Sequence, residues 1–473
     1  MGNAPGLGHQ QGEPRLTTRG ESTGSDEEDD REFFAGKTQA QVDGELELAL
    51  SSMRPLCPVD GVEGLEGALS GLSVKEGTAG EEGRTAAVGV VYDQRMTLHF
   101  GRKTHPERPD RVRAIAQQLA RAELLQQCVR IPARQATGEE KALVHSERMT
   151  AKVHKVAEMV GTDADVIGFI DGDTYVSADS LLAAELAVGS VVDATHAAVQ
   201  GRVRHAFAIV RPPGHHAEAD VSMGFCLWDN VAVAAESAIS RLGLARVAVV
   251  DWDIHHGNGI QDIFERRSDL LYISLHRHPF YPGTGAHTRV GTAAGAGYSV
   301  NVPWPASGFG DADYLLAFQR IVVPVLVEFQ PQLILVASGF DAALGDPLGA
   351  SRVTPACYHA MTTQLLALNG PVVIALEGGY NLASISASAE ACVRALLSLP
   401  HSGPPPTDNL KDETPDILTK VAQAHAEYWQ CFSSFVQPIK EQEVKEDKED
   451  KEDKEDKEDQ HQPKEEADQD KNE

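Results

Sequence analysis

A repeated arrangement of short apolar runs restricts the fold of this chain more than any other feature. Each run leads into a loop with glycine and an ionisable side chain, and the runs lie at 206–210, 247–250, 270–275, 333–337 and 372–376. Continuous runs of Val, Ile, Leu and Ala are typical of parallel strands that are buried on both faces. Helical patterns lie between them, at about 311–328, 354–369 and 383–398. We therefore predict an α/β fold with a mostly parallel sheet and helices on both faces.

The run at 247–250 leads into the densest group of ionisable residues. Asp251, Asp253 and His255 alternate in the sequence, so an extended chain would place them on one side. Ligands of open α/β sheets bind beyond the carboxyl ends of the strands, where this group lies. A strand end whose polar residues only cap loops is the alternative, but so many buried ionisable groups require a partner. We therefore expect a ligand site here.

Two other loops carry polar groups to the same edge of the sheet. His215 and His216 follow the run at 206–210, in a loop too rich in proline and glycine to be helical. Right-handed crossovers would bring this loop to the edge that holds Asp251. Tyr380 follows two glycines after the run at 372–376. Outside this group, the histidines would be read as solvent-facing and the tyrosine as an ordinary buried residue.

The residue types suggest a catalytic metal centre. Asp253 and His255, joined by Asp341 from a later strand end, form an Asp-His-Asp ligand set. Three protein ligands leave a divalent ion open positions for water and substrate. From the ligand types alone, Fe(II), cobalt or manganese would fit, because zinc usually has more nitrogen or sulfur ligands.

The remaining polar groups fit acid–base chemistry beside such an ion. Imidazole titrates near neutral pH, so His215 and His216 would supply the acid–base function. Asp251 and Asn258 are the candidates to hold the tautomer and charge of this pair. The Tyr380 hydroxyl can donate a hydrogen bond to a developing oxyanion.

Charge and hydropathy exclude several classes of function. The net charge of −28 at pH 7 is concentrated at the two ends of the chain. A surface that binds nucleic acid would need a basic face, so we expect no direct nucleic-acid binding but a cationic substrate or partner. We expect no membrane association, because no apolar run approaches a membrane-spanning length and the first 30 residues lack a signal-peptide core.

The cysteine pattern indicates a reducing compartment. The six cysteines form no Cys-x-x-Cys pair and are Cys57, Cys128, Cys226, Cys357, Cys392 and Cys431. They predict free thiols, not a disulfide frame or a thiolate zinc site. Together with the missing signal peptide, they favour the nucleus, the cytoplasm or both.

Six motifs together resemble those of the zinc-dependent histone deacetylases of class II, of the plant type and the cytoplasmic tubulin-deacetylating type. They occur in the family's order and cover roughly residues 86–400. The motifs are Arg211-Pro-Pro-Gly-His-His-Ala-Glu218, Val250-Asp-Trp-Asp-Ile-His-His-Gly-Asn-Gly259, Gly310-Asp-Ala-Asp-Tyr-Leu315, Gly339-Phe-Asp-Ala-Ala343, Gly345-Asp-Pro-Leu-Gly349 and Leu376-Glu-Gly-Gly-Tyr-Asn381. The resemblance implies the arginase-like histone deacetylase fold and hydrolysis of Nε-acetyl-lysine in proteins, with release of acetate.

The resemblance also implies a role for each candidate residue. The Asp-His-Asp set matches the ligands of one zinc ion per chain. His216 matches the general base and acid, and His215 its electrostatic partner. Tyr380 matches the hydroxyl that polarises the substrate carbonyl. Arg111 resembles the arginine of the acetate exit route.

Other positions match the substrate tunnel and its rim. Phe225, next to Gly224, and Tyr281 match the two aromatic walls. Tyr281 departs from the usual Phe, which bears on inhibitor fit and rate and not on the chemistry. Leu348 occupies the gatekeeper position, where relatives that deacetylate polyamines carry Glu, so a neutral residue favours acetyl-lysine in a peptide. Asp173 lies near the rim position that grips the substrate backbone.

Structural potassium is a further implication of the resemblance. The first site would take contacts from Asp251, Asp253, His255, Ser274 and Leu275. A second site would lie near Phe264 and Tyr298.

Three functions are open at this point. The first is an active lysine deacetylase whose partners are an acetylated protein, of the histone-tail or tubulin kind, and a co-repressor complex. The second is an acetylpolyamine deacetylase, against which Leu348 argues. The third is a non-catalytic scaffold that reads acetyl-lysine, against which the complete ligand set and Tyr380 argue.

We expect four segments along the chain. Residues 1–84 are acidic, with little periodicity, and are predicted to be disordered. Residues 85–400 would form the deacetylase catalytic domain, and 401–440 a linker with a short helix around 416–435. Residues 441–473 are a low-complexity charged tail of Lys-Glu-Asp triplets, either a solvated helix or disordered.

Overall fold

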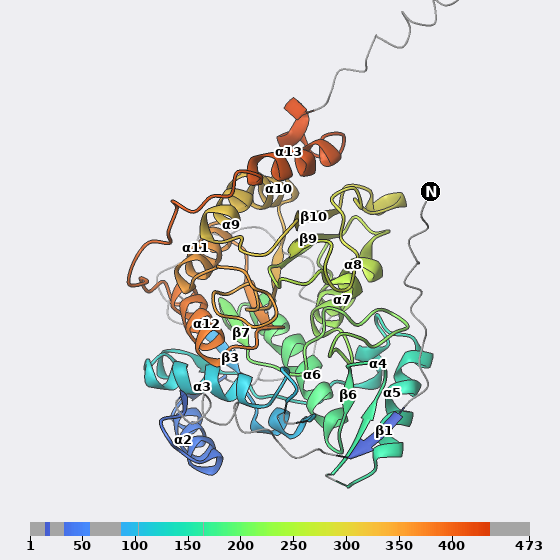
Figure 1. Cartoon of the computed structure of the whole chain (residues 1–473), viewed down its shortest axis with the longest axis vertical. Coiled ribbons are helices and arrows are strands. Elements are labelled where there is room, and N and C mark those ends of the chain that lie inside the picture. Colours follow the sequence, from blue (N-terminus) through green and yellow to red (C-terminus); the bar gives the residue numbers. More distant parts are fainter. Residues whose placement is uncertain (1–14, 19–32, 57–86, 103, 164, 436–473) are drawn as a thin grey trace, which may run out of the picture.

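A nine-stranded sheet forms the centre of the computed structural model, which describes residues 15–18, 33–56, 87–102, 104–163 and 165–435 (Figure 1). The strand order is β10-β9-β8-β11-β12-β7-β3-β4-β2, and every pairing is parallel. The strands are β2 (Arg54–Pro55), β3 (Val88–Val91), β4 (Val129–Arg130), β7 (His205–Ala208), β8 (Val247–Asp251), β9 (Leu270–Arg277), β10 (Ser299–Trp304), β11 (Leu333–Ser338) and β12 (Val372–Leu376).

Helices cover both faces of this sheet. In β8, Ala248 and Val250 belong to one apolar core, and Val247 and Val249 belong to the other. The first core includes residues of α3 and of α9 to α13, and the second includes residues of α5 to α8. Burial on both faces explains the continuous apolar runs. The predicted α/β fold, with a mostly parallel sheet between two helical layers, is confirmed.

The covering helices include those predicted at 311–328, 354–369 and 383–398, which correspond to α9 to α12. They are α3 (Asp110–Arg121), α4 (Gly138–Lys141), α5 (Glu147–Val160), α6 (Ser180–Val199), α7 (Asn230–Leu242), α8 (Asn258–Phe264), α9 (Asp311–Ala317), α10 (Val323–Phe329), α11 (Pro355–Leu366) and α12 (Leu382–Leu396). A π-helical turn, Phe318–Val322, joins α9 to α10, so the predicted helix at 311–328 is continuous but locally widened.

The order of the strands reverses at β8. From β8 the chain continues to β9 and β10 on one side, and then returns to β11 on the other side of β8. Loops that leave neighbouring strands in opposite directions open a crevice at the carboxyl ends of those strands. The loops after β8 and β11 therefore border the natural ligand position of this sheet.

One helix in the described part, α6, is long and apolar enough to cross a membrane by length and composition. Most of its residues are buried, and it packs against α7. Its apolar character therefore matches its position in the core.

A second, three-stranded antiparallel sheet has the order β1-β5-β6. The N-terminal strand β1 (Arg15–Thr18) pairs with β5 (Val166–Phe169), which pairs with β6 (Tyr175–Val176). β1 lies beside α5 in Figure 1. The turn at 170–174, between β5 and β6, contains Asp173, so this sheet carries one of the predicted rim residues.

The prediction that residues 1–84 are disordered is wrong for two parts of that segment. One part is β1, and the other is 33–56, which contains β2 of the central sheet and α2 (Gln39–Ser51), a helix that lies against α3 (Figure 1). Val42, Leu46 and Leu50 recur every four residues and are buried. The acidic composition concealed this period, which gives α2 one apolar face. Residues 1–14, 19–32 and 57–84 lie outside the described residues.

The helix expected around 416–435 corresponds to α13 (Thr414–His425) and a short 3-10 turn, Gln430–Phe435. The indole N–H of Trp429 donates to the carbonyl of Gly297 at 2.8 Å, and α13 packs against β10, an edge strand of the sheet. The five described cysteines are free thiols, as predicted. Cys57 and the charged tail at 441–473 lie outside the described residues.

Candidate metal centre and catalytic pocket

The Asp-His-Asp set converges beyond the carboxyl ends of β8 and β11. Nδ1 of His255 lies 3.0 Å from Oδ1 of Asp253 and 3.0 Å from Oδ2 of Asp341. Ligand atoms of the three residues all lie within 4.8 Å of one another. The structure therefore brings together the three residues that the sequence nominated.

The backbone fixes both carboxylates of this set. The N–H of Gly378 donates to Oδ2 of Asp253 at 2.9 Å, and the N–H of Ile254 donates to Oδ1 of Asp341 at 2.8 Å. A Cβ atom at Gly378 would lie 2.4 Å from Oδ2 of Asp341. Only glycine allows the chain after β12 to approach the carboxylates this closely.

The expected alternation along an extended strand is wrong beyond Asp251. β8 ends at that residue, and the chain bends at 253–255. The N–H of Asp253 donates to Oδ1 of Asp251 at 3.1 Å, and the N–H of His255 donates to Oδ1 of Asp253 at 2.9 Å. These local bonds hold the bend, because an Asp side chain can accept from the backbone two residues on.

The donor set fits a divalent cation. Burial and the negative charge of Asp253 raise the pKa of Asp341 to about 7. For Asp253, burial is outweighed by His215 and His255, which hold its pKa below the usual range. Burial is likewise outweighed at His255, whose pKa the neighbouring carboxylates raise to about 9. Two buried carboxylates and one imidazole offer the oxygen and nitrogen donors that divalent transition metals bind.

His215 is the charged member of the histidine pair. Its Nδ1 lies 3.1 Å from Oδ2 of Asp251, and its Nε2 lies 3.8 Å from Oδ2 of Asp253. Tyr272 donates to the same Asp251 oxygen at 2.9 Å. Burial lowers the pKa of His215, but the two aspartates outweigh it and raise the pKa well above the ordinary value.

His216 is the neutral member of the pair. Its Nδ1 lies 2.9 Å from Oδ1 of Asn258. Burial and the positive charges of His215 and His255 hold the pKa of His216 well below the ordinary value. The two imidazole centroids are only 4.0 Å apart. Two adjacent rings therefore differ in charge: His215 favours the protonated form and His216 the neutral form. Such a separation of pKa values is typical of groups with different roles in proton transfer.

Tyr380 lies next to the pocket after a Gly-Gly turn. Gly379 has φ of +109°, a conformation that favours glycine. The N–H of Tyr380 donates to Oδ2 of Asp346 at 2.7 Å, and the guanidinium carbon of Arg111 lies 5.1 Å from the Tyr380 ring centroid. Burial raises the pKa of Tyr380 well above its ordinary value, so its hydroxyl keeps its proton and can donate it in a hydrogen bond.

Aromatic rings flank the entrance to the pocket. The Phe225 centroid lies 6.0 Å from that of Tyr380, and the Tyr281 centroid lies 5.1 Å from that of His216. A Cβ atom on Gly224 would lie 2.5 Å from Cδ2 of His216 and 3.0 Å from the Tyr281 hydroxyl. Tyr281 is 36% exposed, which places it at the mouth. Glycine is therefore required at 224, because a side chain there would collide with His216.

The turn that contains Asp173 is fastened to the Phe225 wall. The N–H of Phe225 donates to Oγ1 of Thr174 at 3.0 Å. Nε2 of His105 lies 3.3 Å from the Asp173 carbonyl, and the His105 ring lies 4.7 Å from the Phe225 ring. Burial and the charge of Asp171 raise the pKa of Asp173 to about 7. The turn is thus held at the rim of the pocket.

Leu348 is linked to Tyr380 through Asp346, to which sequence reasoning assigned no role. Oδ1 of Asp346 accepts from the N–H groups of Leu348 and Gly349 at 2.9 and 3.0 Å, while Oδ2 accepts from Tyr380. One carboxylate therefore positions both the gatekeeper loop and the tyrosine. Its signal in the sequence was an Asp between Gly and Pro, which is typical of a turn.

Two other buried acids were also missed. Oε2 of Glu377 accepts from the N–H groups of Gly214 and His215 at 2.6 and 3.1 Å, which fixes the histidine loop. Glu107 pairs with Arg111 and Arg211, and all three side chains are fully buried. The place of Glu377 directly before Gly-Gly at a strand end was the available signal.

The residues proposed for potassium lie where β8 and β9 run side by side. Asp251 is paired in register with Ser274, and Leu275 follows in the same strand. At the second position, the Tyr298 carbonyl accepts from the N–H of Tyr272 at 2.9 Å, and Phe264 ends α8. Carbonyl and carboxyl oxygens suit potassium by donor type, and the two sites stay predictions.

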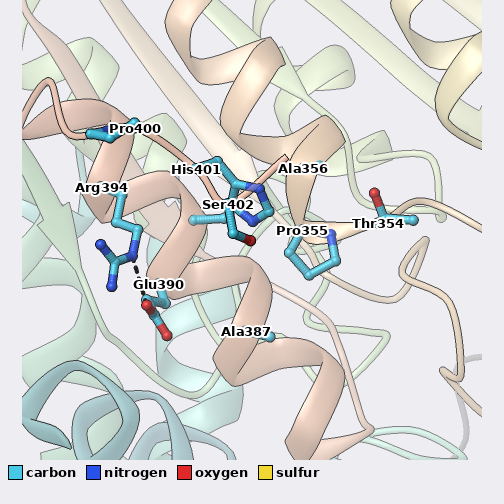
Figure 2. A pocket seen from close by; sticks show the side chains of 10 residues that line it. Thr354, Pro355, Ala356, Ala387, Glu390, Arg394, Pro400, His401 and Ser402 are labelled. Carbon is cyan, nitrogen blue, oxygen red and sulfur yellow. Dashed lines mark hydrogen bonds and ion pairs between the residues drawn. The ribbon is translucent and has the colours of Figure 1, made fainter. Parts of the chain in front are cut away.

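A groove between α11 and α12 is separate from this pocket (Figure 2). Figure 2 shows His401 and Ser402 towards Glu390 and Arg394 of α12, with Thr354 and Pro355 on the other side of the groove. Arg394 donates to Glu390 at 2.7 Å, so these charges neutralise each other. The groove shares no residue with the pocket, and the described part of the chain has no second set of three metal ligands there.

The parallel sheet, with its ligand set beyond β8 and β11, defines the arginase-like class of α/β proteins. Within this class, residues 105–396 match the histone deacetylase domain family. Histone deacetylase 15 of Arabidopsis thaliana is 46% identical over 69% of this chain, and Histone deacetylase clr3 of Schizosaccharomyces pombe is 43% identical over 72%. The chain therefore belongs to the histone deacetylase family.

A solved structure supports this assignment. The match to the crystal structure of the HDA15 HD domain has 43% sequence identity and a TM-score of 0.69. It covers 74% of this chain and 97% of the chain in that structure. The chain spans 59% of the length of the Arabidopsis relative and 52% of that of the fission yeast relative. The similarity is thus to one domain of longer proteins.

Proposed function

We propose that this chain is a zinc-dependent lysine deacetylase that hydrolyses the amide of Nε-acetyl-lysine in proteins and releases acetate. The observation that carries the proposal is the histidine pair beside the Asp-His-Asp set. Two imidazoles 4.0 Å apart prefer opposite charge states, because one faces carboxylates and the other faces an amide oxygen. A pocket that only reads acetyl-lysine needs no such pair.

The pocket residues divide the proton transfers between them. A zinc ion held by the Asp-His-Asp set would act as a Lewis acid toward the water and the substrate carbonyl. His216, whose Nδ1 is engaged by Asn258, accepts the water proton at Nε2 and returns it to the leaving lysine nitrogen. His215 stays charged and stabilises developing negative charge, while the Tyr380 hydroxyl donates to the former carbonyl oxygen.

The shape of the entrance supports a lysine side chain as the ligand. Phe225 lies beside Tyr380 and Tyr281 beside His216, so the two rings would form walls that suit a narrow, unbranched stem. Asp173 at the rim would accept from the substrate backbone. Leu348 carries no charge, so the site has no partner there for the second ammonium of an acetylpolyamine. We therefore favour an acetylated protein over a small amine.

The physiological setting is a further part of the proposal. Histone tails and tubulin-like proteins both offer acetyl-lysine in exposed segments, and a histone substrate would imply transcriptional regulation in the nucleus with a co-repressor complex. A tubulin-like substrate would imply the cytoplasm.

Structural potassium, with contacts from Asp251, Asp253, His255, Ser274 and Leu275, would neutralise part of the buried charge behind the pocket.

A substrate panel with the zinc-loaded protein tests the proposal. Acetylated histone and tubulin peptides should be turned over faster than acetylspermidine. His216→Ala should reduce peptide turnover by about 10²- to 10⁴-fold, and Tyr380→Phe by about 10²- to 10³-fold. Neither should shift the thermal unfolding midpoint appreciably. Near-normal rates in either variant would contradict the mechanism, and binding of peptides without turnover would support the scaffold alternative.

A further inference from the structure

Glu218 is a half-buried acid beside the pocket whose carboxylate has one specific use. Its Oε1 accepts from Nδ2–H of Asn258 at 2.7 Å. Within the described ranges, no lysine, arginine or histidine lies at ion-pair distance from it. Its backbone is held independently, because its N–H donates to the Val221 carbonyl at 2.9 Å and its carbonyl lies 3.0 Å from Nδ1 of His145. The side chain is therefore not needed to fix its own loop.

This contact determines which way the Asn258 amide faces. An ionised carboxylate only accepts hydrogen bonds, so the amide nitrogen of Asn258 must point to Glu218. The amide oxygen then points to Nδ1 of His216, 2.9 Å away, and can only accept. The hydrogen of a neutral His216 must therefore be on Nδ1, and Nε2 must carry the free electron pair.

Rotation of this amide by 180° would reverse the arrangement. The amide nitrogen would face Nδ1 of His216, which would then have to accept, and the hydrogen would move to Nε2. In that tautomer the ring cannot take a proton at Nε2. The other neighbours of the Asn258 nitrogen, the carbonyl of His216 and the sulfur of Met223, both lie at 3.5 Å and are weak alternatives to the carboxylate.

We propose that Glu218 is a positioning residue that sets the tautomer of His216 by orienting the amide of Asn258. This inference deepens the proposed function and rests on it, because the tautomer matters for the rate only if His216 is the base. The interaction is a charge-assisted hydrogen bond, which is stronger than the neutral contacts that compete with it.

Steady-state kinetics with the zinc-loaded protein give the first test. Glu218→Ala should lower kcat by about 10- to 100-fold, with little change in KM, as is usual when a group that orients a catalytic ligand is removed. Glu218→Gln should retain most of the rate, because its amide oxygen can still accept from Asn258. Glu265→Ala is the matched control, since that acid, at the end of α8, pairs with Arg289 at 3.0 Å and should leave kcat unchanged.

A double-mutant cycle separates orientation from loop packing. Asn258→Asp places an acceptor oxygen toward His216 in either orientation of the side chain. Glu218 is then no longer needed to orient residue 258. In the Asn258→Asp background, Glu218→Ala should leave kcat unchanged, or should raise kcat by removing a second carboxylate next to the new one. An equal loss in both backgrounds would mean that Glu218 only supports its loop, and the inference would be overturned.

The tautomer can also be read without substrate. In protein labelled with ¹⁵N-histidine, the resonances of His216, assigned with His216→Gln, should show a protonated Nδ1 and a bare Nε2. Glu218→Ala should increase the population with a protonated Nε2, and an unchanged spectrum would refute the inference. If the wild-type protein deacetylates no peptide yet Glu218→Ala alters this spectrum, the proposed function fails while the positioning role stands.

Discussion

Two buried ionic clusters lie on opposite sides of the segment 377–379, and they are built by opposite rules. Behind the segment, the Glu107 carboxylate is enclosed by Arg111 and Arg211, and the spare guanidinium N–H groups go to backbone carbonyls, including that of Gly379 at 2.6 Å. In front of it, the carboxylates of Asp253 and Asp341 contact imidazoles and backbone N–H groups, and neither pairs with a Lys or Arg of the described residues.

The difference appears in the ionisation of the acids. At Glu107, burial is outweighed by Arg211 and Arg111, and the pKa lies below the usual range. At Asp341 and Glu377 burial prevails instead and raises the pKa of both acids to about 7, although His215 and His255 hold the pKa of the neighbouring Asp253 below its usual range. The rear cluster is electrostatically complete and serves stability, whereas no guanidinium or ammonium group of the described residues balances the pocket carboxylates, an arrangement that suits a cation. Burial of an acid thus serves stability where a guanidinium group accompanies it, and suits a cation site where none does.

The largest expected effect is the loss of the cation site. Zinc added to metal-free protein should raise the free energy of unfolding, by about 2.7 kcal/mol at a free concentration 100 times its Kd. Asp341→Asn removes a ligand and its charge, so both this stabilisation and measurable deacetylation should disappear. Calorimetry with metal analysis checks this. Zinc that stabilises the variant as much as the wild type would show that the ion binds elsewhere.

Substitution in the rear cluster should lower the free energy of unfolding. Glu107→Ala leaves two buried guanidinium groups without their carboxylate, so the free energy of unfolding should fall by about 3–5 kcal/mol. Glu45→Ala is the control, because the exposed Lys37–Glu45 pair, 2.6 Å apart, should contribute less than about 1 kcal/mol. Urea denaturation measures both. Equal, small losses would remove the contrast between the clusters.

The stabilisation that the rear cluster contributes should persist at mildly acidic pH and be lost only below the pKa of an ordinary glutamate. Glu107 has a folded pKa below its unfolded value of about 4.3. Its contribution is therefore fully present above that unfolded value and is lost as the pH falls toward the folded pKa. The stability difference between wild type and Glu107→Gln should be constant from pH 7 to 5 and shrink below about 4. A difference that already shrinks between pH 7 and 5 would contradict this assignment.

The smallest effect is expected at the mouth of the pocket. The Tyr281 hydroxyl forms no hydrogen bond with the described residues, so Tyr281→Phe should change kcat/KM by less than about 10-fold. The unfolding midpoint should not move. Parallel assays of Tyr380→Phe supply the comparison, and a similar loss in the two variants would mean that the Tyr281 hydroxyl has a role in the reaction.

The sequence predicted what depends on local pattern. The apolar runs located the strands, and the residues after β7, β8, β11 and β12 identified the groups that meet, because the carboxyl ends of parallel strands share one edge. It could not predict contacts that depend on how loops fold back. Asp346 beneath Tyr380 and Glu218 behind Asn258 are examples, since nothing in their own surroundings in the sequence marks their partners.

Composition was a poor guide to order in one segment. The first 84 residues are acidic enough to suggest disorder, yet Val42, Leu46 and Leu50 form a buried stripe in α2. A helix needs only one apolar face to pack, and mean composition does not detect a face.

The docking of α2 on α3 has a practical consequence. Asp43 of α2 pairs with Arg113 of α3 at 2.9 Å, and two residues earlier in α3 Arg111 donates to the carbonyls of Gly379 and Glu377, just before Tyr380. A recombinant fragment trimmed to begin at residue 85 would expose the apolar face of α3 that α2 covers, and would leave Arg113 with only its longer contact to Asp110, at 3.4 Å. Poor solubility or sluggish turnover in such a fragment would report the missing helix, and a fragment that starts before residue 33 would avoid the artefact.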